Sequence, residues 1–343
     1  SWYTRHLVSA LLELDDKNNY VLFGGSLRQK NYFHKFAGDL HGKSENHFTY
    51  FSPLLADLFW NRLRFPSIEF FTGKLDVFHS SDWTCPPTCA FSVTTVHDLA
   101  PVKLPEYTDS RVVSVHRRRL ELVKKYVDRI IVPSRATRED LLGLGFDPHK
   151  IRVIPEAPAK EFYSVTEDDV SRVEKKYGLG KYILTIGLNP RKNTTRIIDS
   201  YKKIKKNIPE YNLVIVGAGK IDKSTEGVIH LGHIDFADLP ALYAGSAALI
   251  YTSLYEGFGL PILEAFASGC PVVTSNLSSM KEISEGAAVL VDPYSVESIA
   301  GGIEKALNRN EQNIKKGHEI AKRYSWSKTA ESTVSVYKEF LNI

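Results

Sequence analysis

The sequence predicts an α/β protein of two doubly wound domains, each a parallel sheet with helices on both faces. At 343 residues, the chain is well above the size at which one hydrophobic core stops growing. Short β-branched runs alternate with longer helical patterns along its whole length. These runs are apolar throughout, as in parallel sheets that are buried on both faces.

The first half opens on a predicted helix and continues with five predicted strands. The helix covers 3–14, and the strands cover 20–23, 75–80, 92–98, 129–134 and 151–156. A doubly wound domain usually opens with a central strand and a tight glycine loop before its first helix. We therefore expect the chain to continue before Ser1.

The second half repeats the pattern with six strands, each followed by a helix-forming segment. These strands cover 181–187, 212–219, 228–232, 247–253, 271–276 and 287–293. Prolines, small residues and acids interrupt both periodicities over 155–168, where we place a boundary. The predicted parts are a first domain over 1–158, a second over 159–325, and a terminal amphipathic helix over 326–343. That helix has Val334, Tyr337 and Leu341 on one stripe.

Composition and charge exclude several classes of function. Lys plus Arg at 44 against Asp plus Glu at 40 leaves +4, so no nucleic-acid partner is implied. No stretch approaches the roughly 18 apolar residues of a membrane span, and the first residues lack a signal-peptide layout, which predicts a cytoplasmic protein. Cys85, Cys89 and Cys270 are too few for a disulfide framework or a zinc site, and no pair of histidines has a metal-binding spacing.

The most informative stretch is 254–274. A predicted strand leads into a glycine turn with Glu256, and a helix with Glu264 follows. Ligands of open α/β sheets bind at the carboxyl ends of strands, and free N–H groups at helix starts favour anions. A carboxylate about one turn into such a helix can accept hydrogen bonds from a ribose diol. Taken singly, a glycine turn is more often only a turn, and a helix glutamate is more often solvated.

Together, these features resemble the E-x7-E signature of the retaining nucleotide-sugar glycosyltransferases of family four. Glu256 and Glu264 carry the signature with seven residues between them. The resemblance implies the GT-B fold, two Rossmann-like domains facing each other across a cleft, with a last helix that crosses back to the first domain. It also implies that Glu264 binds the ribose. The transferred sugar would be held by Glu256 and the backbone that follows, Gly257, Phe258 and Gly259.

A second motif lies between a strand end at Gly187 and the next helix. Arg191 and Lys192 come directly before Asn193. Two cations at a helix start can clamp a diphosphate, although such a pair is more often a solvated turn. The segment resembles the glycine and R-K-N element of the same family, which implies that Gly187, Arg191 and Lys192 bind the donor diphosphate.

Further segments fit the resemblance. His97 follows a predicted strand of the first domain, where the family's histidine approaches the transferred sugar, although a lone histidine is more often structural. Residues 80–82 end another strand there. Ser134 and Thr137 resemble the family's V-S-x-x-T element, with helix capping as the alternative. The nucleobase would be read by main-chain groups of Gly232, His233 and Ile234.

The sequence departs from the family pattern at two places. The first is the opening strand with its glycine loop, which relatives have and this sequence lacks. In relatives that strand helps to shape the acceptor side, so the resemblance does not predict the acceptor contacts. The second is Glu156-Ala157-Pro158, where relatives often have Asn-Gly, and we expect this difference to affect only the hinge.

A basic helix over 109–127 offers a contact with membranes. Its predicted buried stripe holds Val112, Leu120, Val123 and Val127, which leaves the basic side chains on a solvated face. These basic residues are Arg117, Arg118, Arg119, Lys124 and Lys125. Many family members act on lipid-linked acceptors, so this face is a candidate for peripheral contact with the inner membrane surface.

The predicted function is that of a retaining glycosyltransferase. It would move a hexose from a nucleoside diphosphate to a glycan or lipid-linked acceptor, with no cofactor and no metal, because basic residues and helix N-termini stabilise the diphosphate. Residues 97–107 resemble the family's mannosyltransferases, which implies GDP-mannose. The alternatives are a UDP-sugar transferase for glucose or N-acetylglucosamine, a nucleotide-sugar 2-epimerase, and a non-catalytic two-domain sugar-binding protein.

Overall fold

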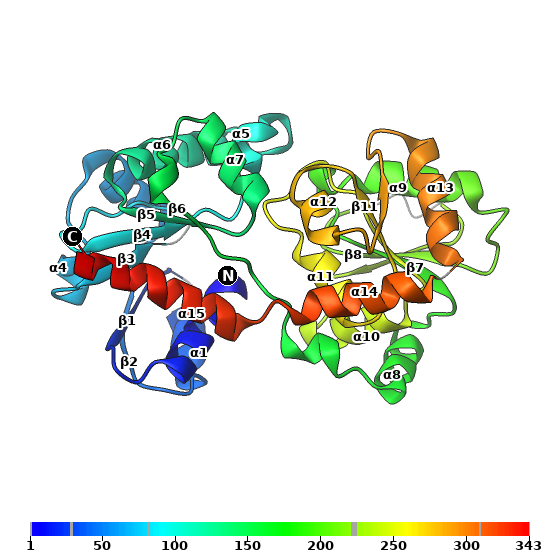
Figure 1. Cartoon of the computed structure of the whole chain (residues 1–343), viewed down its shortest axis with the longest axis horizontal. Helices are drawn as coiled ribbons and strands as arrows, with labels where there is room; N and C mark the ends of the chain where they lie inside the picture. The colour runs from blue at the N-terminus through cyan, green and yellow to red at the C-terminus, as the bar shows by residue number, and fades with distance from the viewer. Residues whose placement is uncertain (1, 28–29, 81–82, 221–224, 309, 343) are drawn as a thin grey trace. The chain divides into compact units, whose positions relative to one another are not determined.

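The computed structural model describes residues 2–27, 30–80, 83–220, 225–308 and 310–342 (Figure 1). The chain forms two compact units. Unit 1 consists of Ser1–Glu156 and Trp326–Ile343, and unit 2 consists of Ala157–Ser325. Each unit contains parallel sheet and helices, which confirms the predicted α/β class.

Unit 1 has a four-stranded parallel sheet in the order β3-β4-β5-β6. Its strands are β3 (Val77–Ser80), β4 (Phe91–Thr95), β5 (Arg129–Val132) and β6 (Ile151–Val153). The helical segments between them are α5 (Ala100–Lys103), η2 (Pro105–Tyr107), α6 (Ser110–Tyr126), α7 (Arg135–Gly143) and η3 (Pro148–Lys150). The strand ends and the connections after them therefore lie on one edge, which carries His97 after β4 and Glu156 after β6.

A separate two-stranded parallel sheet completes the strands of unit 1. It pairs β1 (Tyr20–Gly25) with β2 (Ser44–Thr49), from Tyr20 opposite Ser44 to Gly25 opposite Thr49. The helices α1 (Trp2–Leu14) and α2 (Lys30–Gly38) flank β1 in sequence. The strand β2 was not predicted, because SENHFT is polar over most of its length and lacks the apolar pattern of the other strands.

The segment between β2 and β3 is helical. It contains α3 (Pro53–Ala56), the π-helical turn η1 (Asp57–Leu63) and α4 (Glu69–Thr72). Its inner face packs Ala56, Trp60 and Ile68 together with Phe23 of β1 and Phe78 of β3. The two sheets of unit 1 therefore contribute to one apolar cluster.

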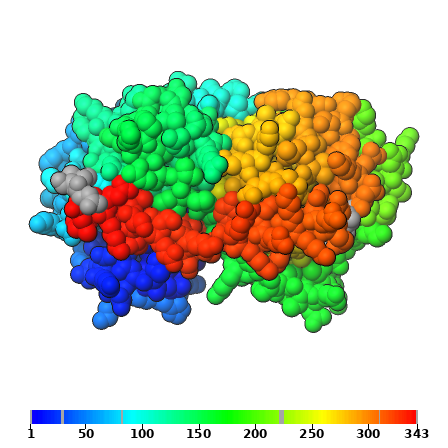
Figure 2. All heavy atoms as spheres, viewed as in Figure 1, coloured from blue at the N-terminus to red at the C-terminus, as the bar shows by residue number. Residues whose placement is uncertain are grey.

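The end of the chain belongs to unit 1. Helix α15 (Trp326–Tyr337), followed by η7 (Lys338–Asn342), packs against α1 through Leu7, Leu11 and Ala330. In the space-filling view, the red end of the chain lies against its blue beginning (Figure 2). The predicted stripe is partly wrong, because Leu341 is 70% exposed, whereas Val336 is buried.

The basic helix also differs from its prediction. In α6, Val113 is buried in place of Val112, and Arg119 points inward with 1% exposure instead of joining the solvated face. The Arg119 guanidinium donates to Thr94 Oγ1 at 2.7 Å and to the Thr95 carbonyl at 3.2 Å. Hydrogen bonds at the end of β4 thus compensate for burying this cation.

Unit 2 has a six-stranded parallel sheet in the order β12-β11-β10-β7-β8-β9. Its strands are β7 (Tyr182–Ile186), β8 (Asn212–Val216), β9 (Val228–Gly232), β10 (Leu249–Tyr251), β11 (Val272–Ser275) and β12 (Val289–Val291). The direction in which successive strands are added reverses between β7 and β10. Open α/β sheets bind ligands at such a point.

Helices cover both faces of this sheet. They are α8 (Glu167–Tyr177), α9 (Thr194–Ile204), α10 (Leu239–Gly245), α11 (Leu260–Ala267), α12 (Ser278–Ser284), α13 (Val296–Leu307) and α14 (Glu311–Lys322), with short turns η4 (Lys160–Tyr163), η5 (Pro190–Lys192) and η6 (Phe236–Asp238). Leu184 and Val214 face one apolar cluster, and their neighbours Ile183 and Ile215 face the other. The strands are apolar throughout because both faces are buried.

Candidate functional site

Three charged side chains meet at the strand ends where the order of unit 2 reverses. Arg191 and Lys192 lie in η5 after β7, and Glu256 follows β10. Arg191 Nη1 lies 2.8 Å from Glu256 Oε2, and Lys192 Nζ lies 2.8 Å from Glu256 Oε1. The two motifs that were separate in sequence therefore form one cluster.

The balance of charge in this cluster fixes the state of Glu256. Burial alone would raise the pKa of this carboxyl group, but the nearby charges of Lys192 and Arg191 outweigh burial and lower the pKa to about 2. Glu256 is thus a carboxylate at neutral pH, and it offsets much of the positive charge of the pair.

Tyr251, at the end of β10, completes the surroundings of Lys192. Lys192 Nζ donates to the Tyr251 hydroxyl at 2.6 Å and lies 4.6 Å from the centre of the Tyr251 ring. Burial raises the pKa of Tyr251 well above its usual value, and the charge of Glu256 adds to this effect. The phenol therefore stays neutral.

Backbone contacts hold the cluster in place. Asn193 has φ 62°, a left-handed conformation that asparagine tolerates better than most residues, and it ends η5 just before α9. Its side-chain amide donates to the carbonyls of Thr252 and Pro293 at 3.1 and 2.7 Å. Arg191 Nη1 also donates to the Tyr255 carbonyl at 2.6 Å. Arg191 and its neutral neighbour Asn193 thus join the loops after β7 and β10.

Gly187 leaves the space that Lys192 occupies. A Cβ atom at Gly187 would lie 2.8 Å from Lys192 Cγ, and the φ of +94° disfavours any side chain there. The Gly187 N–H donates to the Val216 carbonyl at 2.7 Å. Glycine is therefore required at this position for the basic residue to lie over the strand end.

The helix α11 begins at the turn that follows Glu256. Gly259 has φ +107° and caps α11, and Phe258 is buried. Glu264 lies inside this helix with only 5% exposure, and its Oε2 accepts a hydrogen bond from the Tyr243 hydroxyl at 2.9 Å. The second glutamate of the signature is thus a positioned buried group, unlike an ordinary solvated helix glutamate.

The residues predicted near the nucleobase lie at the end of β9 and directly after it. Gly232 has φ +68°, His233 is exposed and Ile234 is largely buried. His230, on the same strand, hydrogen-bonds the Gly217 carbonyl through Nε2 at 2.8 Å. This contact ties β9 to the loop after β8.

In unit 1, His97 has a carboxylate partner that the sequence did not suggest. His97 Nδ1 lies 2.8 Å from Glu156 Oε1. Ser134 caps α7 by accepting from the Thr137 N–H at 3.0 Å, so the capping alternative describes this motif. Ser80 is buried and donates to Thr94 Oγ1 at 2.8 Å, while the remainder of 80–82 lies outside the described residues.

Two further features of the described ranges concern membranes and metal ions. None of the helices in those ranges is long and apolar enough to cross a membrane. Within the same ranges, no group of three His, Cys, Asp or Glu side chains could hold a metal ion.

Comparisons with known proteins divide the chain in the same way. The model of the family described as Glycosyltransferase Family 4 matches residues 1–157, and that of Glycosyl transferases group 1 matches residues 167–324. The chain is 30% identical over 281 residues to O-antigen chain mannosyltransferase B of Escherichia coli, covering 76% of this chain and 74% of that protein. It is 26% identical over 267 residues to the serotype-specific mannosyltransferase WbdA of the same organism. That match covers 71% of this chain and only 33% of WbdA.

Solved structures share the fold at lower identity. Anabaena HepE in complex with UDP-glucose aligns with a TM-score of 0.70 at 17% identity, covering 94% of this chain and 99% of HepE. WaaG, a glycosyltransferase involved in lipopolysaccharide biosynthesis, aligns with a TM-score of 0.65 at 13% identity, covering 93% of this chain and 99% of WaaG.

Proposed function

This chain belongs to family 4 of the glycosyltransferases and is mannosyltransferase-like, and from that premise we propose that it is a retaining transferase which moves mannose from GDP-mannose to a glycan or lipid-linked acceptor. In this reaction, the bond between the anomeric carbon and the β-phosphate oxygen breaks. A bond from that carbon to the acceptor oxygen forms on the same face of the sugar. The hydroxyl proton of the acceptor passes to the departing diphosphate.

The observation that carries this proposal is the cluster of Arg191, Lys192 and Glu256. The developing charge on a leaving diphosphate needs fixed cations, and these two lie at a strand end with their positions set by backbone contacts. A bound diphosphate would compete with Glu256 for both cations. Glu256 would then be available to accept hydrogen bonds from hydroxyls of the sugar.

The rest of the donor would extend over neighbouring strand ends of unit 2. Glu264 is suited to accept hydrogen bonds from the two ribose hydroxyls, since Tyr243 already fixes one of its oxygens. Gly257, Phe258 and Gly259 supply backbone next to the sugar, and the loop from Gly232 to Ile234 supplies main-chain groups for the base. We propose no cofactor and no metal, because the basic pair supplies the charge that a cation would otherwise provide.

The donor sugar is open to a direct comparison. Mannose is favoured because two relatives in Escherichia coli are named mannosyltransferases. UDP-glucose is the second candidate, since HepE, whose fold is similar, was crystallised with it. Titration of GDP and UDP, followed by assays with GDP-mannose, UDP-glucose and UDP-N-acetylglucosamine, separates these donors. If none of them is turned over and neither nucleotide binds, the proposed function is wrong.

The retaining course and the role of Glu256 have their own tests. The anomeric configuration of the product, read by NMR, should match that of the donor. Glu256→Gln should lower kcat while nucleotide binding stays at least as tight, because the amide no longer competes with the diphosphate for Arg191 and Lys192. Activity should also survive EDTA. Inversion at the anomeric carbon, or loss of activity with EDTA that manganese restores, would contradict the assignment.

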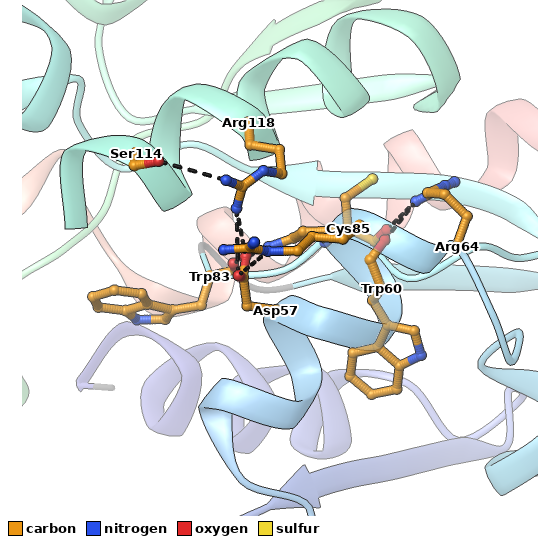
Figure 3. A network of polar contacts seen from close by, with 9 residues as sticks. Asp57, Trp60, Arg64, Trp83, Cys85, Ser114 and Arg118 are labelled. Atoms are coloured by element: carbon orange, nitrogen blue, oxygen red, sulfur yellow. Dashed lines mark hydrogen bonds and ion pairs between the residues drawn. The ribbon is translucent and has the colours of Figure 1, made fainter. Parts of the chain in front are cut away.

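We also propose that unit 1 contacts an anionic membrane surface on the cytoplasmic side, where a lipid-linked acceptor would lie. Seven large hydrophobic side chains of the segment between β2 and β3 are exposed by 41 to 85%, namely Tyr50, Leu54, Leu55, Leu58, Leu63, Phe65 and Phe70. Asp57 joins this segment to α6, because it pairs with Arg118 of that helix at 3.2 Å (Figure 3). Within η1, Asp57 also pairs with Arg62 at 3.1 Å. An apolar face beside basic side chains is the pattern of interfacial binding.

Vesicle sedimentation tests this contact. The protein should sediment with phosphatidylglycerol vesicles more than with phosphatidylcholine vesicles. Leu54→Ser combined with Phe65→Ser should reduce this binding, whereas Tyr294→Ser, which changes an exposed aromatic side chain of unit 2, should not. If the Leu54→Ser and Phe65→Ser double variant sediments with the vesicles as much as the wild type does, the proposed membrane contact is wrong.

A further inference from the structure

His97 and Glu156 form a partly buried pair at the edge of the four-stranded sheet of unit 1. His97 follows β4 and Glu156 follows β6, with β5 between these strands. The ring Nδ1 lies 2.8 Å from Glu156 Oε1, and the two side chains are 26% and 13% exposed. The sheet brings together two residues that lie far apart in sequence.

Neighbouring elements hold both members of the pair. The ring of Tyr3, from α1, meets the His97 ring edge-on with centroids 4.4 Å apart. The Tyr3 hydroxyl lies 3.2 Å from Thr95 Oγ1, two residues before His97. Thr329 of α15 donates to the carbonyl of Pro155, the residue directly before Glu156, at 2.8 Å. The pair is thus fixed from α1, β4 and α15.

The chemistry of this contact decides the state of the imidazole. A carboxylate can only accept a hydrogen bond, so His97 Nδ1 must carry a proton. In the neutral ring, the lone pair then belongs to Nε2, and the contact also fixes the plane of the ring. Carboxylates that hold a functional histidine in this way set its tautomer and orientation.

We propose that Glu156 is a positioning residue for glycosyl transfer, which holds His97 in one orientation and one tautomer so that Nε2 is the ring nitrogen presented to the transferred sugar. This inference rests on the proposed function, to which it adds that His97 approaches the transferred sugar, as the family resemblance implies. The difference from the family pattern at 156–158, which we expected to affect only the hinge, then also affects the site through Glu156.

The chain offers a matched control for this pair. On β2, His47 Nε2 lies 2.7 Å from Glu45 Oε1, and the side chain of Glu45 is 67% exposed. The Glu45 pair is also a carboxylate–imidazole contact in the same unit, but it joins Nε2 and lies on the other sheet. Substitutions at Glu45 therefore show how much activity is lost when a Glu–His contact away from the site is removed.

The experiment compares Glu156→Leu, Glu156→Gln, Glu45→Leu and His97→Gln in the full chain. Release of nucleoside diphosphate from the preferred nucleotide sugar in water gives kcat and KM without an acceptor. Nucleotide titration gives the affinity of unit 2, which none of these changes touches. Long-range 1H–15N spectra give the tautomer of His97, assigned by its absence in His97→Gln.

The expected result is a loss of kcat by roughly ten- to a hundred-fold in Glu156→Leu, with nucleotide affinity unchanged. Glu156→Gln should recover most of the rate, because its amide oxygen also accepts from Nδ1–H. Glu45→Leu should match the wild type. In a His97→Gln background, Glu156→Leu should cost less than about two-fold more, because its effect passes through the imidazole.

Three outcomes would overturn the inference. The first is full turnover in Glu156→Leu, and the second is the same loss with and without His97. The third is a wild-type His97 whose proton lies on Nε2 alone. A wild type that neither binds nucleotides nor turns over any donor would refute the proposed function instead. The tautomer spectra of the wild type and Glu156→Leu would still decide whether Glu156 positions the ring.

Discussion

At Glu256, burial and charge act in opposite directions, and the charges prevail. Its pKa of about 2 lies below the usual value of 4.5, so ionisation of this group stabilises the folded protein above about pH 4.5. That contribution, on the order of 3 kcal/mol at neutral pH, is lost as the pH falls from about 4.5 to about 2. The stability of the cluster is therefore tied to the same groups that we propose bind the donor.

We expect the difference in unfolding free energy between the wild type and Glu256→Gln to shrink as the pH falls through this range. Urea unfolding at pH 7, 4.5 and 3 measures it. Glu45→Gln, which removes an exposed carboxylate, should show a much smaller change with pH. A difference that is constant with pH would mean that Glu256 is not stabilised as a carboxylate.

The basic pair gives a second prediction at the scale of single residues. Lys192→Ala should weaken binding of the nucleoside diphosphate by roughly 1.5 to 3 kcal/mol, because a charge-assisted hydrogen bond is lost. Calorimetric titration measures the change. Lys203→Ala is the control, since Lys203 pairs with Glu297 at 2.6 Å on the exposed side of α9. If both variants bind the nucleoside diphosphate with similar affinity, Lys192 does not contribute to the donor site.

At the scale of elements, the contact between α10 and α11 fixes Glu264. Tyr243→Phe removes the donor to this carboxylate, which we expect to destabilise the protein by about 1 to 3 kcal/mol and to raise the KM for the donor with little change in kcat. Thermal unfolding and steady-state kinetics measure the two effects.

Tyr182→Phe is the control for this prediction. The Tyr182 hydroxyl donates to the Leu242 carbonyl at 2.8 Å, so its loss should cost stability in the same unit without touching Glu264. If both variants raise KM equally, the effect comes from general loosening of unit 2 and not from Glu264.

Elements with a strong apolar pattern were predictable from sequence, and those without one were not. The β-branched strands around Ile183 and Ile250 stand out because both faces of their sheet are buried. The polar strand β2 carries no such signal. Arg119 was misplaced because a helix of alternating basic and apolar residues does not reveal which cation will find acceptors such as Thr94 inside the fold.

In the candidate site, too, some features were predictable from the sequence and others depend on the folded sheet. The spacing of Glu256 and Glu264 and the Arg-Lys pair were visible in the sequence as motifs. That Glu256 pairs with both cations depends on β7 and β10 being neighbours, which is a property of the sheet order. The partnership of His97 with Glu156 likewise depends on strands that meet only in the folded sheet.

At the scale of the whole molecule, the chain returns to unit 1 after completing unit 2. Val336 of α15 is buried against Val93 and Ile131 of the four-stranded sheet and against Ile154, which follows β6. Glu339, just beyond α15, pairs with Arg129 and Arg152, and burial would raise its pKa, but the hydrogen bonds and charges of the two arginines outweigh burial and hold that pKa below the usual value. Unit 1 therefore depends on residues at the far end of the sequence.

Because unit 1 depends on α15, a disruptive substitution in α15 should lower the unfolding free energy of unit 1 and leave that of unit 2 unchanged. Val336→Asp should destabilise unit 1 by more than about 3 kcal/mol, because it buries an unpaired charge, whereas Ser335→Asp, exposed on the same helix, should have little effect. Arg191, Lys192, Glu256 and Glu264 all lie in unit 2, so Val336→Asp should lose transfer but still bind nucleotide. Calorimetry should then show two transitions, of which only the later one rises in the presence of the nucleotide that binds the wild type. A single transition, or loss of nucleotide binding together with transfer, would show that the units fold as one.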